Sequence, residues 1–306
     1  MSFEVLHPGI LTLLQDSGRF GYQHLGVTTG GPLDEHAFVW ANHLLGNVPG
    51  STQLEITYGL LQLRCQADTT IALTGADLGA RLNDRPVRPW RTYVLQKGDE
   101  LSFATPVAGL RCYLAVAGGL RTESRLGSCA TVCREGLGGI DGTGAKLKPG
   151  DRLAFEPQRT AIDARVPDWA IPDYDRPLEL GVMPGYQHDE FDIVQRTKLF
   201  SASYQVSQNM DRMGYRLSGD AIQPRRNGIV SEGIAYGAIQ IPSDGQPIVL
   251  LKDRQTIGGY PKIGCISALG AGQLAQRGPG SVVRFHPMDV SQAEAQRMIF
   301  NHTFGL

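Results

Sequence analysis

Charged and amide side chains concentrate in residues 231–264, between short apolar runs and glycine turns. The chain has only six lysines, and two of them, Lys252 and Lys262, lie in this stretch. A lysine can act as a point charge on a phosphate, or as a proton carrier where its pKa is lowered. The composition therefore favours a binding site for an anion here. Solvated charges on the rim of a hairpin are an equally good interpretation of the two lysines.

A second polar run, SQNMDRMGYRL at residues 207–217, contains Asn209 and Arg212. A site for a phosphate or a carboxylate needs forked or pointed cations, together with backbone N–H groups that glycine leaves accessible. Arg212 could hold such an oxyanion with two parallel hydrogen bonds. On its own, however, a structural ion pair with Asp211 or another carboxylate is the better interpretation. His188, with the two acidic residues that follow it, suits proton transfer and surface solvation equally well.

Polar residues also gather in the first half of the chain, at residues 14–19, 28–34 and 54–59. They suit either a site or an interface. Neither Ser nor Cys catalysis is indicated, because the chain contains no G-x-S-x-G elbow and no signature of a catalytic cysteine. Residues 139–146, GIDGTGAK, resemble a phosphate loop but lack its Gly-Lys-Ser/Thr ending and its strand-to-helix context, so we interpret them as a turn. The five cysteines are scattered without C-x-x-C spacing, so we expect reduced thiols and no zinc site.

The elements that must position these residues are mainly β-strands, because apolar runs of four to eight residues alternate with glycine and proline turns. Residues 238–241 and 247–251 are predicted to form a hairpin around a Ser-Asp-Gly turn. A helix is predicted to begin after Asp34, its N-cap, and to end at Gly46. A second helix is predicted to begin at Ser291, with Glu294 at the capping-box spacing.

Composition limits the classes of function. A net charge of -1 and a pI near 6.7 give no field that would attract nucleic acid or an anionic membrane. No stretch approaches the roughly 20 apolar residues that span a bilayer, and the N-terminus lacks the features of a signal peptide. We therefore expect a cytoplasmic protein that binds neither nucleic acid nor membrane.

A chain of 306 residues predicts two domains. The proline-rich segment of residues 161–177 is the predicted connection between an N-terminal domain, residues 1–160, and a C-terminal domain, residues 178–306. Three signatures recur in the same order on either side of it, which predicts two related β domains. They are Pro8-Gly9 with Pro184-Gly185, Arg19 to Tyr22 with Arg212 to Tyr215, and Tyr58 to Leu63 with Tyr236 to Ile241.

Long strings of the sequence resemble the C-subunit family of the bacterial 5-oxoprolinases. Among them are LLQDSGRFGYQHLGVTTGGPLDEHAFVWANHLLGN, LEITYG, LTGAD, YLAVAGGL, SQNMDRMGYRL and EGIAYGAIQIPSDGQPIVLLKDRQTIGGYPKIG. The likeness covers nearly the whole chain, and the same family is related to the carboxyltransferase half of urea carboxylase. It implies two related cyclophilin-like β-barrel domains with a few short helices.

The resemblance also implies an activity. In that system the C subunit acts with the B subunit, its direct partner, and with a third component, the A subunit. Together they open the lactam of 5-oxoproline to L-glutamate with ATP, through a phosphorylated lactam. Whether Mg²⁺ accompanies the ATP is left open. We expect the chain to be inactive alone. By this analogy the catalytic residues are Glu232, Lys252, Asp253 and Lys262, and the substrate-binding residues are Asn209, Arg212, Tyr236, Gln255, Thr256 and Tyr260.

Two other interpretations stay open. A biotin-dependent carboxyltransferase acting on urea or an amide would need biotin carried by another polypeptide, because this sequence has no Met-Lys biotinylation signature. A regulatory protein would instead bind a partner that resembles the B subunit, without catalysis. The neighbouring genes would discriminate between the oxoprolinase and the carboxyltransferase. Genes for A and B subunits would indicate the first activity, and a gene for a biotin carboxylase would indicate the second.

Overall fold

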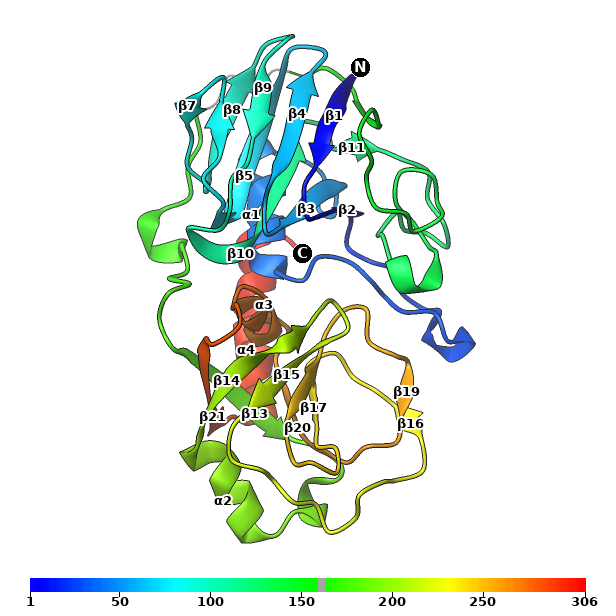
Figure 1. Cartoon of the computed structure of the whole chain (residues 1–306), viewed down its shortest axis with the longest axis vertical. Coiled ribbons are helices and arrows are strands. Elements are labelled where there is room, and N and C mark those ends of the chain that lie inside the picture. The colour runs from blue at the N-terminus through cyan, green and yellow to red at the C-terminus, as the bar shows by residue number, and fades with distance from the viewer. Residues whose placement is uncertain (159–162) are drawn as a thin grey trace. The chain divides into compact units, whose positions relative to one another are not determined.

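The computed structural model describes residues 1–158 and 163–306 and is mainly β, which confirms the predicted fold class. The chain forms two compact units, the first comprising Met1–Phe20 and Gly30–Asp175, and the second Gly21–Thr29 and Arg176–Leu306 (Figure 1). The predicted domain boundary at residue 160 and the first two residues of the predicted connection lie outside the described residues. The rest of that connection, up to Asp175, belongs to the first unit.

The first unit contains two sheets in its described part. Their orders are β11-β12-β1-β4-β9-β6-β7 and β2-β3-β10-β5-β8. The strands are β1 (Ser2–Pro8), β2 (Leu11–Gln15), β3 (Gln53–Thr57), β4 (Leu61–Cys65), β5 (Thr69–Asp77), β6 (Arg81–Leu82), β7 (Arg85–Pro86), β8 (Arg91–Leu95), β9 (Glu100–Ser102), β10 (Ala108–Val116), β11 (Leu120–Arg121) and β12 (Arg152–Phe155). Two short 3-10 helices, Cys133–Glu135 and Asp168–Ala170, lie in its connections.

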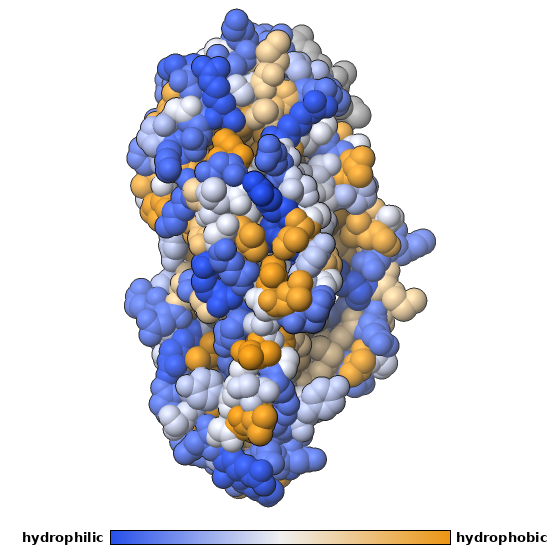
Figure 2. Space-filling view, turned by 90° about the vertical axis from the view of Figure 1, so that its right-hand side faces the viewer, coloured by the Kyte–Doolittle hydropathy of each residue, from blue (hydrophilic) through white to orange (hydrophobic). Residues whose placement is uncertain are grey.

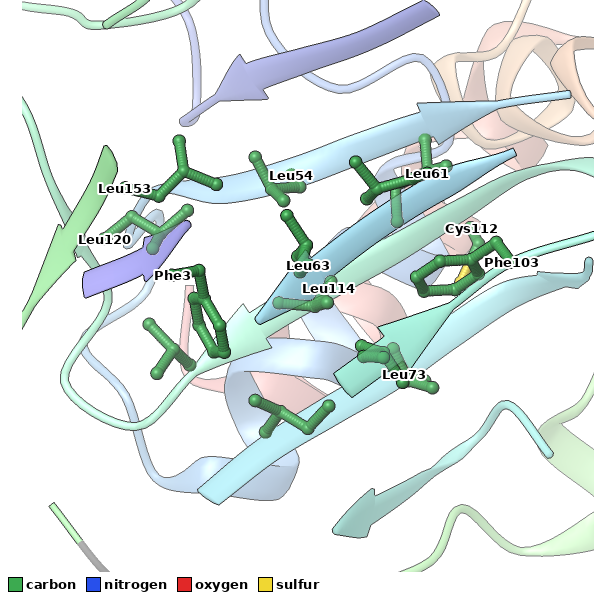
Figure 3. Close-up of a cluster of buried hydrophobic side chains, with 14 of the residues drawn as sticks. Phe3, Leu54, Leu61, Leu63, Leu73, Phe103, Cys112, Leu114, Leu120 and Leu153 are labelled. Atoms are coloured by element: carbon green, nitrogen blue, oxygen red, sulfur yellow. The ribbon is translucent and has the colours of Figure 1, made fainter. Parts of the chain in front are cut away.

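Side chains from both sheets form the core of this unit. Figure 3 shows Phe3 and Leu63 from one sheet facing Leu54, Leu73 and Leu114 from the other. On β4 the burial alternates from residue to residue, so one face packs inward and the other meets solvent. The β pattern of the sequence therefore corresponds to two packed sheets.

Helix α1 (Glu35–Leu45) has the predicted ends. The Asp34 side chain accepts a hydrogen bond from the N–H of Ala37, which satisfies one of the donors that a helix N-terminus leaves unpaired. Gly46 ends the helix in the left-handed conformation with a φ of 65°, which costs glycine no Cβ clash. Both predicted caps are confirmed.

In the second unit a closed barrel runs β13-β20-β17-β18-β15-β14-β21. Its strands are β13 (Leu178–Pro184), β14 (Ser203–Met210), β15 (Gly214–Ser218), β17 (Ala238–Gln240), β18 (Ile248–Leu250), β20 (Lys262–Ile266) and β21 (Val282–Pro287). The predicted hairpin is confirmed as β17 and β18, whose turn closes with a hydrogen bond from the Gly245 N–H to the Pro242 carbonyl. A two-stranded ribbon, β16 (Glu232–Gly233) with β19 (Ile257–Gly258), lies outside the barrel order (Figure 1).

Helices α2 (Ile193–Ser201), α3 (Ala268–Ala275) and α4 (Val290–Phe304) complete this unit, with 3-10 turns at Gln23–Leu25 and His188–Glu190. The last helix begins at Val290, one residue before the predicted start, and the predicted cap is wrong by two residues. Its N-cap is Asp289, which forms a capping box with Gln292 in place of the predicted Ser291 and Glu294. None of the helices in the described part of the chain combines the length and the apolar character needed to cross a membrane.

Two of the recurring signatures, Pro8-Gly9 with Pro184-Gly185 and Tyr58 to Leu63 with Tyr236 to Ile241, adjoin differently connected strands. In the first unit β1, which ends at Pro8, pairs directly with β4, the strand that follows Tyr58. In the second unit β20 separates β13, which ends at Pro184, from β17, the strand that follows Tyr236. These two signatures therefore mark strand ends and turns and not one shared pairing pattern.

Candidate functional site

Arg212 and Asp253 form a buried, two-pronged ion pair. The Nε and Nη2 atoms of Arg212 lie 2.9 and 3.0 Å from the two carboxylate oxygens of Asp253, and each side chain is 7% exposed. The Asp253 N–H also donates to the Arg212 carbonyl. The Arg212 guanidinium, which was expected to hold an oxyanion of the substrate, therefore binds the carboxylate of Asp253 in the same chain. The structural interpretation of Arg212 is favoured, with Asp253 and not Asp211 as its partner.

Lys262 lies in a second cluster, the Lys262 cluster, defined by Gln187, Glu232, Gln240, Gly258 and Lys262. The ammonium of Lys262 lies 2.7 Å from the Glu232 carboxylate, and Gln187 Nε2 donates to the same oxygen at 2.9 Å. The Lys262 ammonium, followed by the Gln187 amide, holds the pKa of the Glu232 carboxyl below its usual range. The Lys262 side chain is 9% exposed and that of Glu232 is 39% exposed, so only the carboxylate reaches solvent to a substantial extent.

Tyr236 is the centre of a third group, the Tyr236 cluster. The Lys252 ammonium lies 4.6 Å from the centre of its ring, and the Arg254 guanidinium carbon lies 5.8 Å from it. The negative face of an aromatic ring attracts cations at such distances. Arg254 also donates to the carbonyl of Ile234, which ties this cluster to the segment that carries Glu232. Two positively charged side chains, Lys252 and Arg254, therefore lie near the ribbon.

The remaining predicted site residues surround these clusters unevenly. Gln255 and Thr256 are half-buried just before β19, and the Thr256 carbonyl accepts the N–H of Ile234. Tyr260 follows the same strand and is 45% exposed. Asn209 lies exposed on β14, where its own N–H donates to the hydroxyl of Ser207. The segment 231–264 is therefore brought together locally, and Asn209 is not among the residues that define the clusters.

Sequence reasoning missed Gln187, Gln240 and Arg254. Gln240 is 2% exposed, and its position between apolar neighbours on β17 was the signal that could have found it. Gln187 directly precedes the predicted acid-base group at His188. The His188 ring hydrogen-bonds the Ile263 carbonyl, so it is the neighbouring amide that reaches Glu232.

Two grooves open on the second unit, and neither contains the clusters. One, of about 520 Å³, is lined by residues of β13, α2 and the start of α4, with His188 at its edge. The other, of about 430 Å³, lies between α3 and α4. In the Lys262 and Tyr236 clusters, Lys262 is buried, while Glu232, Tyr236 and Lys252 are partly exposed.

The glycine-rich residues 139–146 form a turn in the first unit, as interpreted from the sequence. Asp141 accepts hydrogen bonds from both the N–H and the hydroxyl of Thr143, so a carboxylate occupies the position where a phosphate loop presents donors. The next regular element is the strand β12 and not a helix. This segment does not fit a nucleotide phosphate.

Two buried charged residues of the first unit, Arg19 and Glu55, have partners within the chain. Arg19 is 1% exposed and donates to the carbonyls of Arg125, Ser128 and Ala130. The buried Glu55 accepts from the Tyr113 hydroxyl and from the Leu33 N–H, just before α1. These contacts hold loops and a helix start together. All five cysteines are free thiols, as expected, and within the described residues no group of His, Cys, Asp or Glu is arranged to hold a metal ion.

The comparison with protein families matches residues 25–287 to the family described as carboxyltransferase domain, subdomain A and B. Among characterised relatives, the chain is 35% identical to the C subunit of 5-oxoprolinase from Escherichia coli (strain K12). The match extends over 292 residues, which are 95% of this chain and 92% of that protein.

Solved structures give the same family relation with different lengths. The chain superimposes on the urea amidolyase of K. lactis with a TM-score of 0.91 and 28% identity, over 99% of this chain but 20% of that one. The Kluyveromyces lactis urea carboxylase gives the same TM-score and identity over 29% of its length. The chain therefore corresponds to one part of these larger proteins.

Proposed function

The chain belongs to the carboxyltransferase domain family, subdomains A and B, and from this premise we propose that it is the C subunit of an ATP-dependent 5-oxoprolinase. The observation that carries the proposal is the match to the C subunit of Escherichia coli over nearly the full length of both chains. An enzyme with a subunit of this kind has further subunits. We propose that the B subunit binds this chain directly and that the A subunit completes the enzyme.

The proposed reaction opens the lactam of 5-oxoproline to L-glutamate. An unactivated lactam is a poor electrophile, so phosphorylation of its carbonyl oxygen would activate the ring carbon. One water then adds to that carbon and the ring C–N bond breaks, and a second water releases phosphate from the acyl phosphate to give the new carboxylate of glutamate. ATP, when bound, supplies the phosphoryl group for the first of these steps. Within this chain the two cations on Tyr236 suit the stabilisation of the negative charge that develops on the substrate, and Lys262 suits the negative charge that the acid group of the substrate already carries.

The roles that we propose for the other residues follow from their partners. Arg212 and Asp253 position the loop between β18 and β19, since each satisfies the other. Glu232 is the ionised partner of Lys262, since its pKa is lowered, while Gln255, Thr256 and Tyr260 orient the substrate. The described residues contain cations but no phosphate loop, so we propose that ATP, with any Mg²⁺ that accompanies it, binds in the assembled enzyme and not to this chain alone.

Reconstitution tests the proposal. The chain is co-purified with A and B subunits of a 5-oxoprolinase from the same organism, and glutamate formation from 5-oxoproline is measured with and without ATP. We expect glutamate only in the assembled enzyme and only with ATP. ATP-independent glutamate formation by this chain alone, or an assembled enzyme that leaves 5-oxoproline intact, would overturn the proposal.

The Lys262→Met variant tests the site within that enzyme. We expect kcat/KM to fall by about tenfold, the usual effect of losing one hydrogen bond to a charged group of the substrate. Lys97→Met is the matched control, because Lys97 is exposed on the first unit and its loss removes the same charge. Full activity of Lys262→Met would remove this residue from the site, and Lys252→Met is tested in the same way.

A second candidate function is the transfer of a carboxyl group from biotin to urea or an amide. It is favoured by the TM-score of 0.91 to urea carboxylase over 99% of this chain. Biotin would supply the carboxyl group from another polypeptide. Incorporation of labelled bicarbonate into urea, in a mixture with the partner subunits, would support this activity over lactam opening.

A further inference from the structure

Two buried polar side chains lie opposite each other on neighbouring barrel strands. Gln240 on β17 and Lys262 on β20 are register partners, because an irregularity beside them makes Ile239 face Gly264 and Gln240 face Lys262. Residues that are directly opposite in an antiparallel pair present their side chains on one face of the sheet. Gln240 is 2% exposed and Lys262 is 7% exposed. An amide and an ammonium thus share one covered patch of the barrel.

The ribbon covers this patch. Glu232 and Gly258 are register partners within the ribbon, and the carboxylate of Glu232 contacts Lys262. Gly258 lies against Gln240, since a Cβ atom added to it would be 3.0 Å from Gln240 Nε2. The four residues therefore form a closed ring of neighbours, in which two come from the barrel and two from the ribbon.

The amide of Gln240 has unsatisfied donor capacity. Its Nε2 atom is buried and has no hydrogen-bond partner within the described structure. A buried donor without an acceptor is costly and uncommon in folded proteins, so such a group calls for an explanation. Next to it, Lys262 has one charged partner, the carboxylate of Glu232. An acceptor oxygen placed between the two side chains would satisfy the amide.

The bond that closes the site is a weak one. Glu232 is 39% exposed, and partly exposed ion pairs contribute little to stability because water competes for both charges. The ribbon that carries it has two residue pairs, Glu232 with Gly258 and Gly233 with Ile257. Elements with so few hydrogen bonds open locally at small cost. A competing anion can therefore replace Glu232 without unfolding the barrel.

We propose that Gln240 and Lys262 form a carboxylate-binding site, and that Glu232 is the internal carboxylate that fills it when no ligand is bound. A carboxylate is favoured over a phosphate because the group that already contacts Lys262 is one, paired with the ammonium at 2.7 Å and accepting a hydrogen bond from the Gln187 amide. A bound carboxylate accepts from Lys262 with one oxygen and from Gln240 with the other. The proposal rests on the proposed function only in naming the acid group of the lactam as the natural occupant.

A titration with propionate tests the site in the full chain, independently of catalysis. The side-chain amide signals of ¹⁵N-labelled glutamine are followed by NMR, and the signal of Gln240 is assigned with Gln240→Met. We expect propionate to shift that signal in a saturable way. Glu232→Gln removes the internal competitor and keeps an acceptor for Gln187, so it should tighten propionate binding about fivefold, the effect of removing one partly exposed ion pair.

Two variants and a control complete the test. Lys262→Met and Gln240→Met should each weaken propionate binding about tenfold, the usual effect of losing one hydrogen bond to a charged group. Lys97→Met should bind propionate like the unaltered chain. Because the two site variants alter different strands, a failure of one to fold leaves the other informative.

Three outcomes would overturn the carboxylate site: no saturable shift even in Glu232→Gln, weaker binding in Glu232→Gln than in the unaltered chain, or tighter binding of inorganic phosphate than of propionate. The two proposals fail separately. If propionate binds as expected and the assembled enzyme forms no glutamate, the carboxylate site stands and the proposed function fails. If glutamate forms and propionate does not bind, the proposed function stands and the carboxylate site fails.

Discussion

At the scale of single residues, the pair of Arg212 and Asp253 is the contact on which the loop after β18 depends. Both side chains are 7% exposed, and two hydrogen bonds join them. Desolvation of both charges offsets much of their attraction, so the pair as a whole adds little, but loss of one partner leaves a buried charge without compensation. The single and double substitutions therefore have very different expected effects.

We expect Asp253→Asn and Arg212→Met each to lower the free energy of unfolding by about 3 to 5 kcal/mol, measured in urea. The double variant, Arg212→Met with Asp253→Leu, should recover most of that loss. Single variants that unfold like the unaltered chain would contradict the structural role. Glutamate formation by the reconstituted double variant separates this role from substrate binding, since a positioning pair is replaceable and a substrate ligand is not.

At the scale of elements, the residues before α4 decide which side chain caps the helix. Asp289 accepts the N–H of Gln292, whose side chain in turn accepts the N–H of Asp289. Glu294 is an exposed residue further along the helix. We expect Asp289→Ala to lower the Tm by about 2 °C, whereas Glu294→Ala leaves it unchanged. If the two substitutions lowered the Tm equally, Asp289 would not be the decisive cap of this helix.

Local sequence patterns predicted elements where local forces decide them. The caps of α1 and the turn of the β17–β18 hairpin depend on residues within a few positions, and all were predicted. Helix α3 was missed because it contains Gly270 and Gly272, which disfavour helix in isolation. Burial of Ala271 and Leu274 overrides that propensity, and no local pattern reports it.

The same distinction applies to the candidate site. Residues 231–264 were predicted as a unit, and their clusters do form within a short segment. The contribution of Gln187 depends on a contact across 45 residues, which only the fold brings about. Gln240 was recognised as part of a repeated strand pattern but not as a buried amide, because the closing of the barrel and the ribbon decides its burial.

At the scale of the whole molecule, the surface is chemically mixed. Figure 2 shows one face on which hydrophobic residues are scattered among hydrophilic ones. With a net charge of -1, the chain has no strong field of either sign, so long-range attraction contributes little to the binding of its ligands. Recognition therefore depends on short-range contacts such as those of the Lys262 cluster.

The pH dependence of stability is a property of the whole molecule, because it sums every group whose pKa changes on folding. Two groups contribute to the loss of stability at low pH. In the folded chain the pKa of Glu232 is lowered by Lys262, and the pKa of His36 is lowered by burial, which Asp34 partly opposes. For both groups the unfolded chain binds more protons than the folded one. Stability from His36 is lost as the pH falls below about 6.5, and stability from Glu232 as the pH falls through its lowered pKa.

At high pH the folded chain binds more protons than the unfolded chain, so stability falls as the pH rises. Burial raises the pKa of Cys129 to about 12 and that of Cys265 to about 11, so these thiols ionise first in the unfolded chain. Stability is therefore lost as the pH rises above about 8.5, the ordinary pKa of a thiol. We expect the Tm, measured from about pH 3 to 10 at one ionic strength, to have a broad maximum between about 6.5 and 8.5.

His36→Gln isolates one part of the acid side of this profile. Trp40 Nε1 donates to the His36 ring, and the glutamine oxygen can accept in its place, so the contact need not be lost. The substitution should flatten the fall in Tm that begins below about pH 6.5 and leave the steeper fall that the carboxylates cause at lower pH. A profile of His36→Gln that follows the unaltered chain throughout would show that burial does not suppress the charge of this histidine.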